Sequence, residues 1–210
     1  MKRLIPVFLM VILTCMSAFA GDISNIRGEY TRVAGQPFKF NGKTVEVMEF
    51  MSFYCSHCYA FEKSIPVIKG NFPNKIKWKL VPIYWGNGSS KPGEAYLLAE
   101  EAGKGEQMKK AIFNAMFVDK KDIGSVEVLE SLASQAGMGF DFSMKLRSGA
   151  KAEEARKAVD LAHQYGVEET PTIIIAGSLM TNPRASGGGT DAFKDNAITI
   201  IKSILETTVS

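Results

Sequence analysis

The sequence contains few of the residues that bind metals or cross-link small folds. Its 210 residues include three cysteines (Cys15, Cys55 and Cys58) and two histidines. So few cysteines exclude a scaffold held together mainly by disulfides. The hydrophobic content of 46% and the charged content of 22% exclude a disordered chain and indicate an ordinary globular protein.

The chain also has little net charge. The formal net charge is +3, and Lys2 and Arg3 supply two of the three positive charges. A protein that binds nucleic acid usually carries a strongly basic surface, because it must neutralise phosphates. We therefore expect no nucleic-acid partner.

A single long apolar run occurs in the chain, at residues 4–19, directly after the basic residues Lys2 and Arg3. It ends at Ala18-Phe19-Ala20, which matches the small-x-small pattern of a signal-peptidase site. We predict a signal peptide over residues 1–20 that is cleaved after Ala20, and export of the remaining chain into an oxidising compartment. Two alternatives stay open: a retained membrane anchor, and a lipoprotein signal at Cys15, which is less favoured because Thr14 precedes it.

The rest of the chain alternates between strand and helix patterns. A run at residues 44–53 has the character of a buried central strand, and an amphipathic helix follows it, with Pro66 expected to kink that helix. Together with the next strand these elements form a βαβ unit, for which parallel strands are expected. The predicted strands are residues 38–40 (a short edge strand), 44–53, 76–83 and 171–176.

Between the predicted strands at residues 76–83 and 171–176 the pattern is helical. Four apolar stripes at helical spacing lie between residues 94 and 165, and a last amphipathic helix spans residues 193–204. The fold class that this predicts is α/β, a sheet domain interrupted by an all-helical insertion. We expect residues 21–91 and 164–210 to form the sheet domain and residues 92–163 to form the insertion.

The chemistry is expected at Cys55-Ser56-His57-Cys58, where the central strand passes into its helix. A thiol at a helix N-terminus faces unpaired backbone N–H groups that favour the thiolate. His57 is able to carry a positive charge near neutrality, which would stabilise that thiolate further. We predict Cys55 as the nucleophile and Cys58, one turn later, as the resolving cysteine.

Three other interpretations of the pair are less favoured. A structural disulfide closing so short a loop would stabilise the fold little. A zinc site would need two further ligands, for which only His57 and His163 remain, and haem attachment needs a histidine where Tyr59 stands. We therefore predict no metal and no cofactor other than the Cys55–Cys58 disulfide itself; His163 is expected to lie at a helix end.

The string from Val45 to Glu62 (VEVMEFMSFYCSHCYAFE) resembles the active-site strand and helix of the thioredoxin superfamily, and most closely the DsbA-type periplasmic thiol:disulfide oxidoreductases. The resemblance implies a thioredoxin-like fold with an inserted helical domain. It also implies that Thr170-Pro171 forms a cis-proline loop facing the cysteines, so that Ser56, Thr170 and Pro171 bind substrate. The alternative for Pro171 is a trans proline that starts an edge strand.

Glu49 lies six residues before Cys55, within the apolar strand, and matches a buried acid of similar proteins. Burial raises the pKa of a carboxyl group, so Glu49 would be able to exchange protons with the Cys58 thiol. The alternative is an acid at the strand end that contacts solvent, Lys77 or Lys79.

The function that the resemblance implies is oxidation of protein thiols. A monomer would donate its Cys55–Cys58 disulfide to reduced or unfolded exported proteins, and a membrane quinone-linked oxidase similar to DsbB would reoxidise it. Two departures, Ser56 between the cysteines and Thr170 before the proline, keep a reductase or isomerase of the same fold open. A peptide-binding or chaperone-like module without redox activity is the third alternative.

Overall fold

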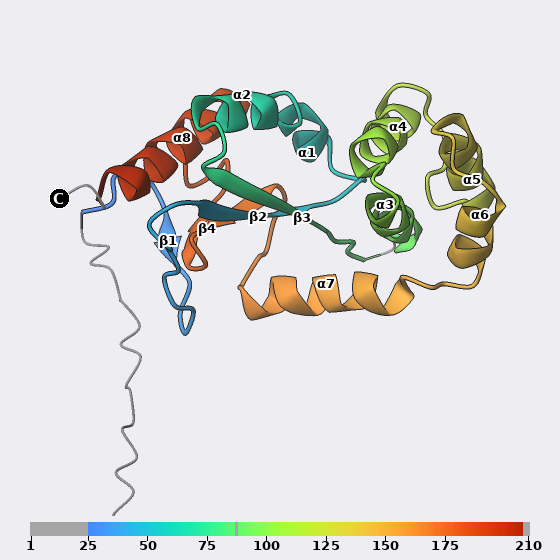
Figure 1. Cartoon of the computed structure of the whole chain (residues 1–210), viewed down its shortest axis with the longest axis horizontal. Coiled ribbons are helices and arrows are strands. Elements are labelled where there is room, and N and C mark those ends of the chain that lie inside the picture. The colour runs from blue at the N-terminus through green and yellow to red at the C-terminus, as the bar shows by residue number, and fades with distance from the viewer. Residues whose placement is uncertain (1–24, 87, 208–210) are drawn as a thin grey trace, which may run out of the picture.

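The computed structural model describes residues 25–86 and 88–207. The predicted signal peptide, its cleavage site and Cys15 lie outside the described residues. The centre of the fold is a five-stranded sheet with the strand order β1-β5-β4-β2-β3 (Figure 1). The strands are β1 (Thr31–Arg32), β2 (Val45–Met51), β3 (Ile76–Pro82), β4 (Thr172–Ile175) and β5 (Leu179–Thr181).

β2 is the central strand that the sequence predicted. It pairs in parallel with β3 on one side and antiparallel with β4 on the other, so the parallel β2–β3 unit is confirmed. Val47, Glu49 and Met51 share one face of β2 because side chains alternate along a strand. Five of its seven residues are buried, which agrees with its nearly continuous apolar run.

Three helices cover the face of the sheet to which Val47 points: α1 (Ser56–Phe61), α2 (Ser64–Asn71) and α8 (Thr190–Thr207). The break between α1 and α2 reflects Pro66, which has no N–H to donate and whose ring crowds the carbonyl of Glu62 four residues earlier. Fully buried side chains fill the space between these helices and the sheet; they include Val47, Phe61, Ile68, Ile173, Phe193 and Ile200.

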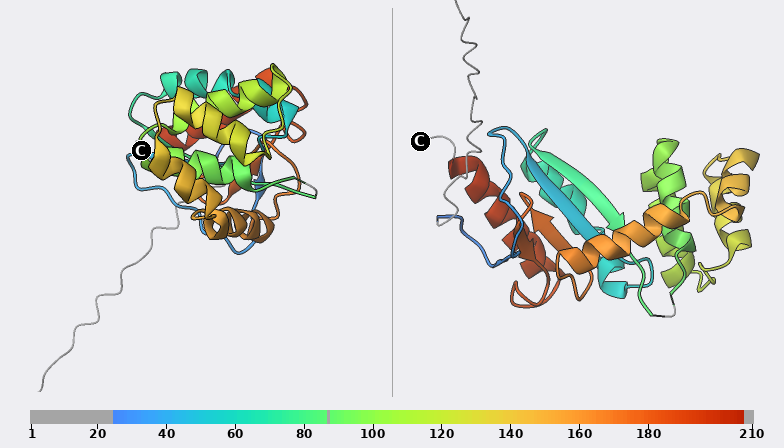
Figure 2. Two further views of the ribbon diagram at one scale, coloured as in Figure 1. Left: turned by 90° about the vertical axis from the view of Figure 1, so that its right-hand side faces the viewer. Right: turned by 90° about the horizontal axis from the view of Figure 1, so that it is seen from below.

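Five helices lie between β3 and β4 in the chain and form the inserted helical part beside the sheet (Figure 1). They are α3 (Lys91–Glu101), α4 (Gly105–Phe117), α5 (Val126–Gln135), α6 (Phe140–Arg147) and α7 (Ala152–Gln164). The long helix α7 runs back from the helical part along the other face of the sheet (Figure 2). Its end packs with Phe50, Val81 and Ile174 through Ala162.

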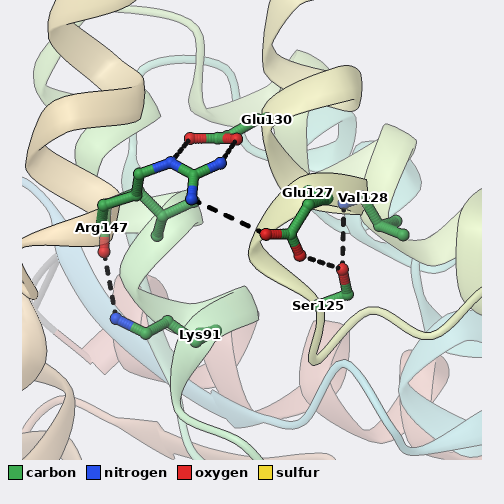
Figure 3. Close-up of polar contacts among 7 residues, drawn as sticks. Lys91, Ser125, Glu127, Val128, Glu130 and Arg147 are labelled. Atoms are coloured by element: carbon green, nitrogen blue, oxygen red, sulfur yellow. Dashed lines mark hydrogen bonds and ion pairs between the residues drawn. The ribbon is translucent and has the colours of Figure 1, made fainter.

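Polar contacts join the outer helices of the insertion (Figure 3). Arg147, at the end of α6, forms a two-pronged ion pair with Glu130 of α5, with Nε donating to Oε1 at 2.7 Å. Lys91 Nζ, at the start of α3, donates to the carbonyl of Leu146 at 3.0 Å. Ser125 caps α5 by accepting the Val128 N–H at 3.3 Å, a contact that satisfies one of the free donors at the helix start.

Several local expectations differ from the structure. Residues 38–40 are not a strand, because only the Lys39 N–H joins a neighbouring segment in a ladder-like contact, to the Ala176 carbonyl at 2.8 Å. The short strands β1 and β5 were not predicted, and α6 lies in the stretch predicted as helical but matches none of the four predicted apolar stripes. β1 and β5 are two and three residues long, too short for a periodic pattern. In the part of the chain that is described, no helix is both long and apolar enough to span a bilayer.

Candidate active site

Cys55 lies at the junction of β2 and α1 and is the N-cap residue of that helix. Its Sγ accepts the backbone N–H of Cys58 at 3.4 Å, so the sulfur itself takes the place of a capping oxygen. Both cysteines are free thiols, with Cys55 partly exposed and Cys58 only 1% exposed. The pair therefore has one accessible and one covered sulfur.

The surroundings of Cys55 stabilise its thiolate. A hydrogen bond from the Cys58 thiol, the Thr170 side chain and the backbone N–H groups of Cys58 and His57 lower the pKa of Cys55 from 9.0 to about 5, against the effect of partial burial. At neutral pH such a thiol is almost entirely ionised. His57 is exposed, and it lowers the pKa of Cys55 through its backbone N–H. Stabilisation by the imidazole stays a prediction.

Cys58 has the opposite environment. Burial first, and the neighbouring Cys55 second, raise the pKa of Cys58 well above 9.0. Its neighbours in the core include Met51, Phe53 and Phe113. A buried thiol of this kind stays protonated when free and needs a proton whenever its sulfur is released as a leaving group.

The loop before β4 brings Thr170 and Pro171 to the cysteines from 115 residues away in the sequence. The Thr170–Pro171 peptide bond is cis, as the resemblance led us to expect. When it is protonated, the Cys55 thiol donates to the Thr170 carbonyl at 3.2 Å. The backbone of residue 170 thus lies directly beside the accessible sulfur, while Ser56 is exposed at the first position of α1.

A cavity of about 170 Å³ opens next to this loop. Its walls are the side of α1 that carries His57, the cis-proline loop and the start of α8. The residues that line it are His57, Phe61, Glu169, Thr170, Pro171, Pro183, Gly189, Thr190 and Phe193.

Glu49 is completely buried, so the alternative of a solvent-facing acid is wrong. Trp78 Nε1 donates to Glu49 Oε2 at 2.8 Å. Burial, followed by the charge of Glu62, raises the pKa of Glu49 from 4.5 to about 7, whereas the Trp78 hydrogen bond and Lys109 lower it. A carboxyl group with this pKa exchanges its proton near neutrality.

Sequence reasoning missed three residues around Glu49: Glu62, Trp78 and Lys109. Lys109 carried a signal in the sequence, since it lies three residues before Ile112 and seven before Met116 and so shares their apolar helix face.

Among residues 25–86 and 88–207, no group of three or more His, Cys, Asp or Glu side chains is placed to hold a metal ion.

An α/β fold with a Cys-x-x-Cys pair at a helix start and a cis-proline beside it defines a thiol:disulfide oxidoreductase of the thioredoxin type. The model of one family, described as the DSBA-like thioredoxin domain, matches residues 46–191. The chain belongs to this family.

Relatives with the name thiol:disulfide interchange protein DsbA extend the match over nearly the whole chain. The protein from Haemophilus influenzae is 27% identical over 98% of this chain and 100% of its own length. The protein from Pseudomonas aeruginosa is 28% identical over 85% of each chain. The crystal structure of Pseudomonas aeruginosa DsbA has a TM-score of 0.70, covers 83% of this chain and 91% of that chain, and is 24% identical, which supports the fold.

Proposed function

We propose that this oxidoreductase works as an oxidant, donating its Cys55–Cys58 disulfide to reduced proteins after export. The observation that carries the proposal is the lowered pKa of Cys55, about 5. Stabilising the Cys55 thiolate stabilises the reduced form of the pair, and a stable reduced form makes the disulfide a stronger oxidant.

The reaction consists of two exchanges. A substrate thiolate attacks Cys55 Sγ and forms a mixed disulfide, while the electron pair of the broken S–S bond leaves on Cys58 Sγ. A second substrate thiolate then attacks the substrate sulfur of the mixed disulfide and releases Cys55 as a thiolate. The substrate gains a disulfide, and the chain keeps two electrons and a reduced pair.

The residues around the pair have separate roles in this scheme. Cys55 is the nucleophile and attacked sulfur, and Cys58 is the resolving and leaving sulfur. The backbone of Thr170, held beside Cys55 by Pro171, pairs with an extended substrate segment in the manner of strand addition. Ser56 contacts the substrate at the mouth of the site, and His57 adds to the stability of the Cys55 thiolate.

Glu49 serves as the proton source and acceptor for Cys58. The Cys58 thiolate released in the first exchange is buried, and a buried thiolate is costly unless it is protonated. Glu49 points from β2 to the face that α1 covers, the face on which Met51 packs with Cys58. It delivers its proton through water and is itself reprotonated when the pair is reoxidised.

The cellular setting is also proposed. The chain is exported with residues 1–20 as a signal peptide removed after Ala20, acts in the periplasm as a monomer, and is reoxidised by a membrane quinone-linked oxidase similar to DsbB. Residues 21–91 and 164–210 form the thioredoxin-like domain and residues 92–163 the inserted one.

The reduction potential tests the direction of the reaction. An oxidant should have a potential near about −120 mV, whereas a value near that of thioredoxin, about −270 mV, would contradict the proposal. Equilibration with a glutathione buffer measures it. A second assay with a scrambled, fully oxidised protein distinguishes the isomerase alternative, because an oxidant reshuffles wrong disulfides poorly.

A further inference from the structure

A buried group of charges lies where the sheet, α1 and the inserted helices meet. Lys109 of α4 is 4% exposed at its side chain, and its Nζ lies 2.9 Å from Glu62 Oε2 at the end of α1. A weaker contact joins Lys109 to the exposed Glu106 at 3.2 Å. The buried cation of this group therefore comes from the insertion, and the half-buried anion that it contacts comes from the end of the active-site helix.

Two buried carboxyl oxygens in this group lack a hydrogen-bond partner: Glu49 Oε1 and Glu62 Oε1. Trp78 holds only the other oxygen of Glu49, and Lys109 holds the other oxygen of Glu62. A buried carboxylate oxygen without a donor is unfavourable, whereas a protonated carboxyl group tolerates it better. Of these two carboxyl groups, Lys109 thus contacts only that of Glu62.

The surrounding charges agree with an unequal division of protons. The charge of Glu62 raises the pKa of Glu49, and the charge of Lys109 lowers the pKa of both Glu49 and Glu62. Lys69 of α2 lies close enough to favour the charged form of both carboxyl groups as well. Tyr96 of α3 lies close enough to Glu49 for the charge of Glu49 to contribute to raising the pKa of Tyr96, and Trp78 of β3 donates a hydrogen bond to Glu49. Two like charges in one buried site do not both ionise easily, so the carboxyl group without the cation keeps its proton to higher pH.

We propose that Lys109 is a positioning residue of the redox site: by pairing with Glu62, it makes Glu49 the carboxyl group that holds the exchangeable proton. The inserted helices then supply part of the proton-transfer apparatus as well as covering the active site. The inference rests on the proposed role of Glu49, but it concerns the protonation of Glu49 and can be tested apart from oxidation.

The test is a ¹³C NMR titration of the glutamate side-chain carboxyl groups in the reduced protein, with the Glu49 signal assigned from its loss in Glu49→Gln. Lys109→Met should raise the pKa of Glu62, because the cation that keeps Glu62 ionised is removed, so that the exchangeable proton is shared and two coupled carboxyl signals titrate in place of one. Glu62→Gln should lower the pKa of Glu49 by about one unit, because a like charge is removed while the cation stays. A second titrating carboxyl group in Lys109→Met, together with a lower pKa of Glu49 in Glu62→Gln, separates a charge effect from a loss of structure.

Two further variants complete the test. Lys110→Met removes an exposed lysine from the neighbouring position of α4 and should leave the Glu49 titration unchanged. If Lys109→Met does not fold, Glu62→Gln/Lys109→Met removes both members of the pair, so that no buried charge is orphaned; relative to Glu62→Gln it should raise the pKa of Glu49.

A single titrating carboxyl group in Lys109→Met, or a pKa of Glu49 that is no higher in Glu62→Gln/Lys109→Met than in Glu62→Gln, would overturn the assignment. The pH dependence of substrate oxidation, measured on the same variants, tests the proposed function separately. If the Glu49 titration moves and the pH profile of oxidation does not follow, Lys109 keeps its assigned role and the proton-transfer role of Glu49 is refuted.

Discussion

The titration of Cys55 is the most direct consequence of the active-site geometry. In the reduced protein the thiolate of Cys55 should form with a midpoint near pH 5, against an ordinary value of about 8.5 for a free cysteine. Thiolate absorbance at 240 nm follows the ionisation, and Cys55→Ser identifies the signal. Cys58 stays protonated across this range because burial raises its pKa well above 9.0.

The same shift makes the stability of the reduced protein depend on pH. Because the pKa of Cys55 is lower in the folded state, its contribution is fully present above the unfolded-state pKa and is lost as the pH falls toward 5. Between pH 7 and pH 5 the unfolded chain binds about one more proton at this site, which corresponds to about 2.7 kcal/mol. Partial exposure of Cys55 screens the interaction, so about 1–2 kcal/mol is expected.

Measuring this contribution requires a difference between two proteins. Glu49 acts in the opposite sense over the same range, since its pKa is raised to about 7 in the folded state. Urea unfolding of reduced wild type and Cys55→Ser at pH 5 and pH 7 cancels the effect of Glu49. The difference between the two free energies of unfolding should grow by about 1–2 kcal/mol toward pH 7.

Replacing Cys58 examines the largest cause of the shift. Cys58→Ala removes the hydrogen bond from the Cys58 thiol to the Cys55 thiolate and should raise the pKa of Cys55 by about one to two units, the equivalent of a hydrogen bond to a charged group. Cys58→Ser keeps a donor at that position and should raise it less. A midpoint above pH 7 in the wild type, or equal values in the two variants, would refute the reasoning.

Three other predictions follow from burial and pKa. At pH 6, iodoacetamide should modify Cys55 and leave Cys58 unmodified in the folded, reduced protein, because only Cys55 is ionised and accessible. Peptide mass spectrometry measures the labelling. Equal labelling of both cysteines would contradict the opposite pKa shifts of the two thiols. The free energy of unfolding of Glu49→Gln, relative to that of wild type, should increase by up to about 3 kcal/mol as the pH rises from 5 to 8, because the raised pKa of Glu49 makes its ionisation costly in the folded wild type. Urea unfolding at both pH values measures this difference. A difference that does not depend on pH would contradict the burial of a titrating group. Ile112→Ala, in the core of the insertion, should lower the free energy of unfolding in urea by about 2–5 kcal/mol, whereas Lys110→Ala, on the exposed side of the same helix, should change it by less than about 0.5 kcal/mol. Similar losses in both variants would show that the apolar face of α4 is misassigned.

The sequence alone determined the class of fold and the central chemistry. The apolar run of β2 and the Cys55-Ser56-His57-Cys58 motif after it are local signals, because a strand period, a helix start and a thiol spacing all lie within a few neighbouring residues. The break caused by Pro66 and the helical character of the insertion were predictable for the same reason. The resemblance then led us to expect Thr170 and Pro171 beside the cysteines, although they lie far away in the chain.

The tertiary structure alone decided which groups surround Cys58 and Glu49. Lys109 meets Glu62 because α4 packs against α1, and Trp78 reaches Glu49 through the parallel register of β2 and β3. Such contacts depend on how helices and strands pack, which neither periodicity nor spacing encodes. The pKa of each buried group follows from these neighbours and from its depth, so the sequence identifies the reactive thiols while the packing sets when each of them carries a proton.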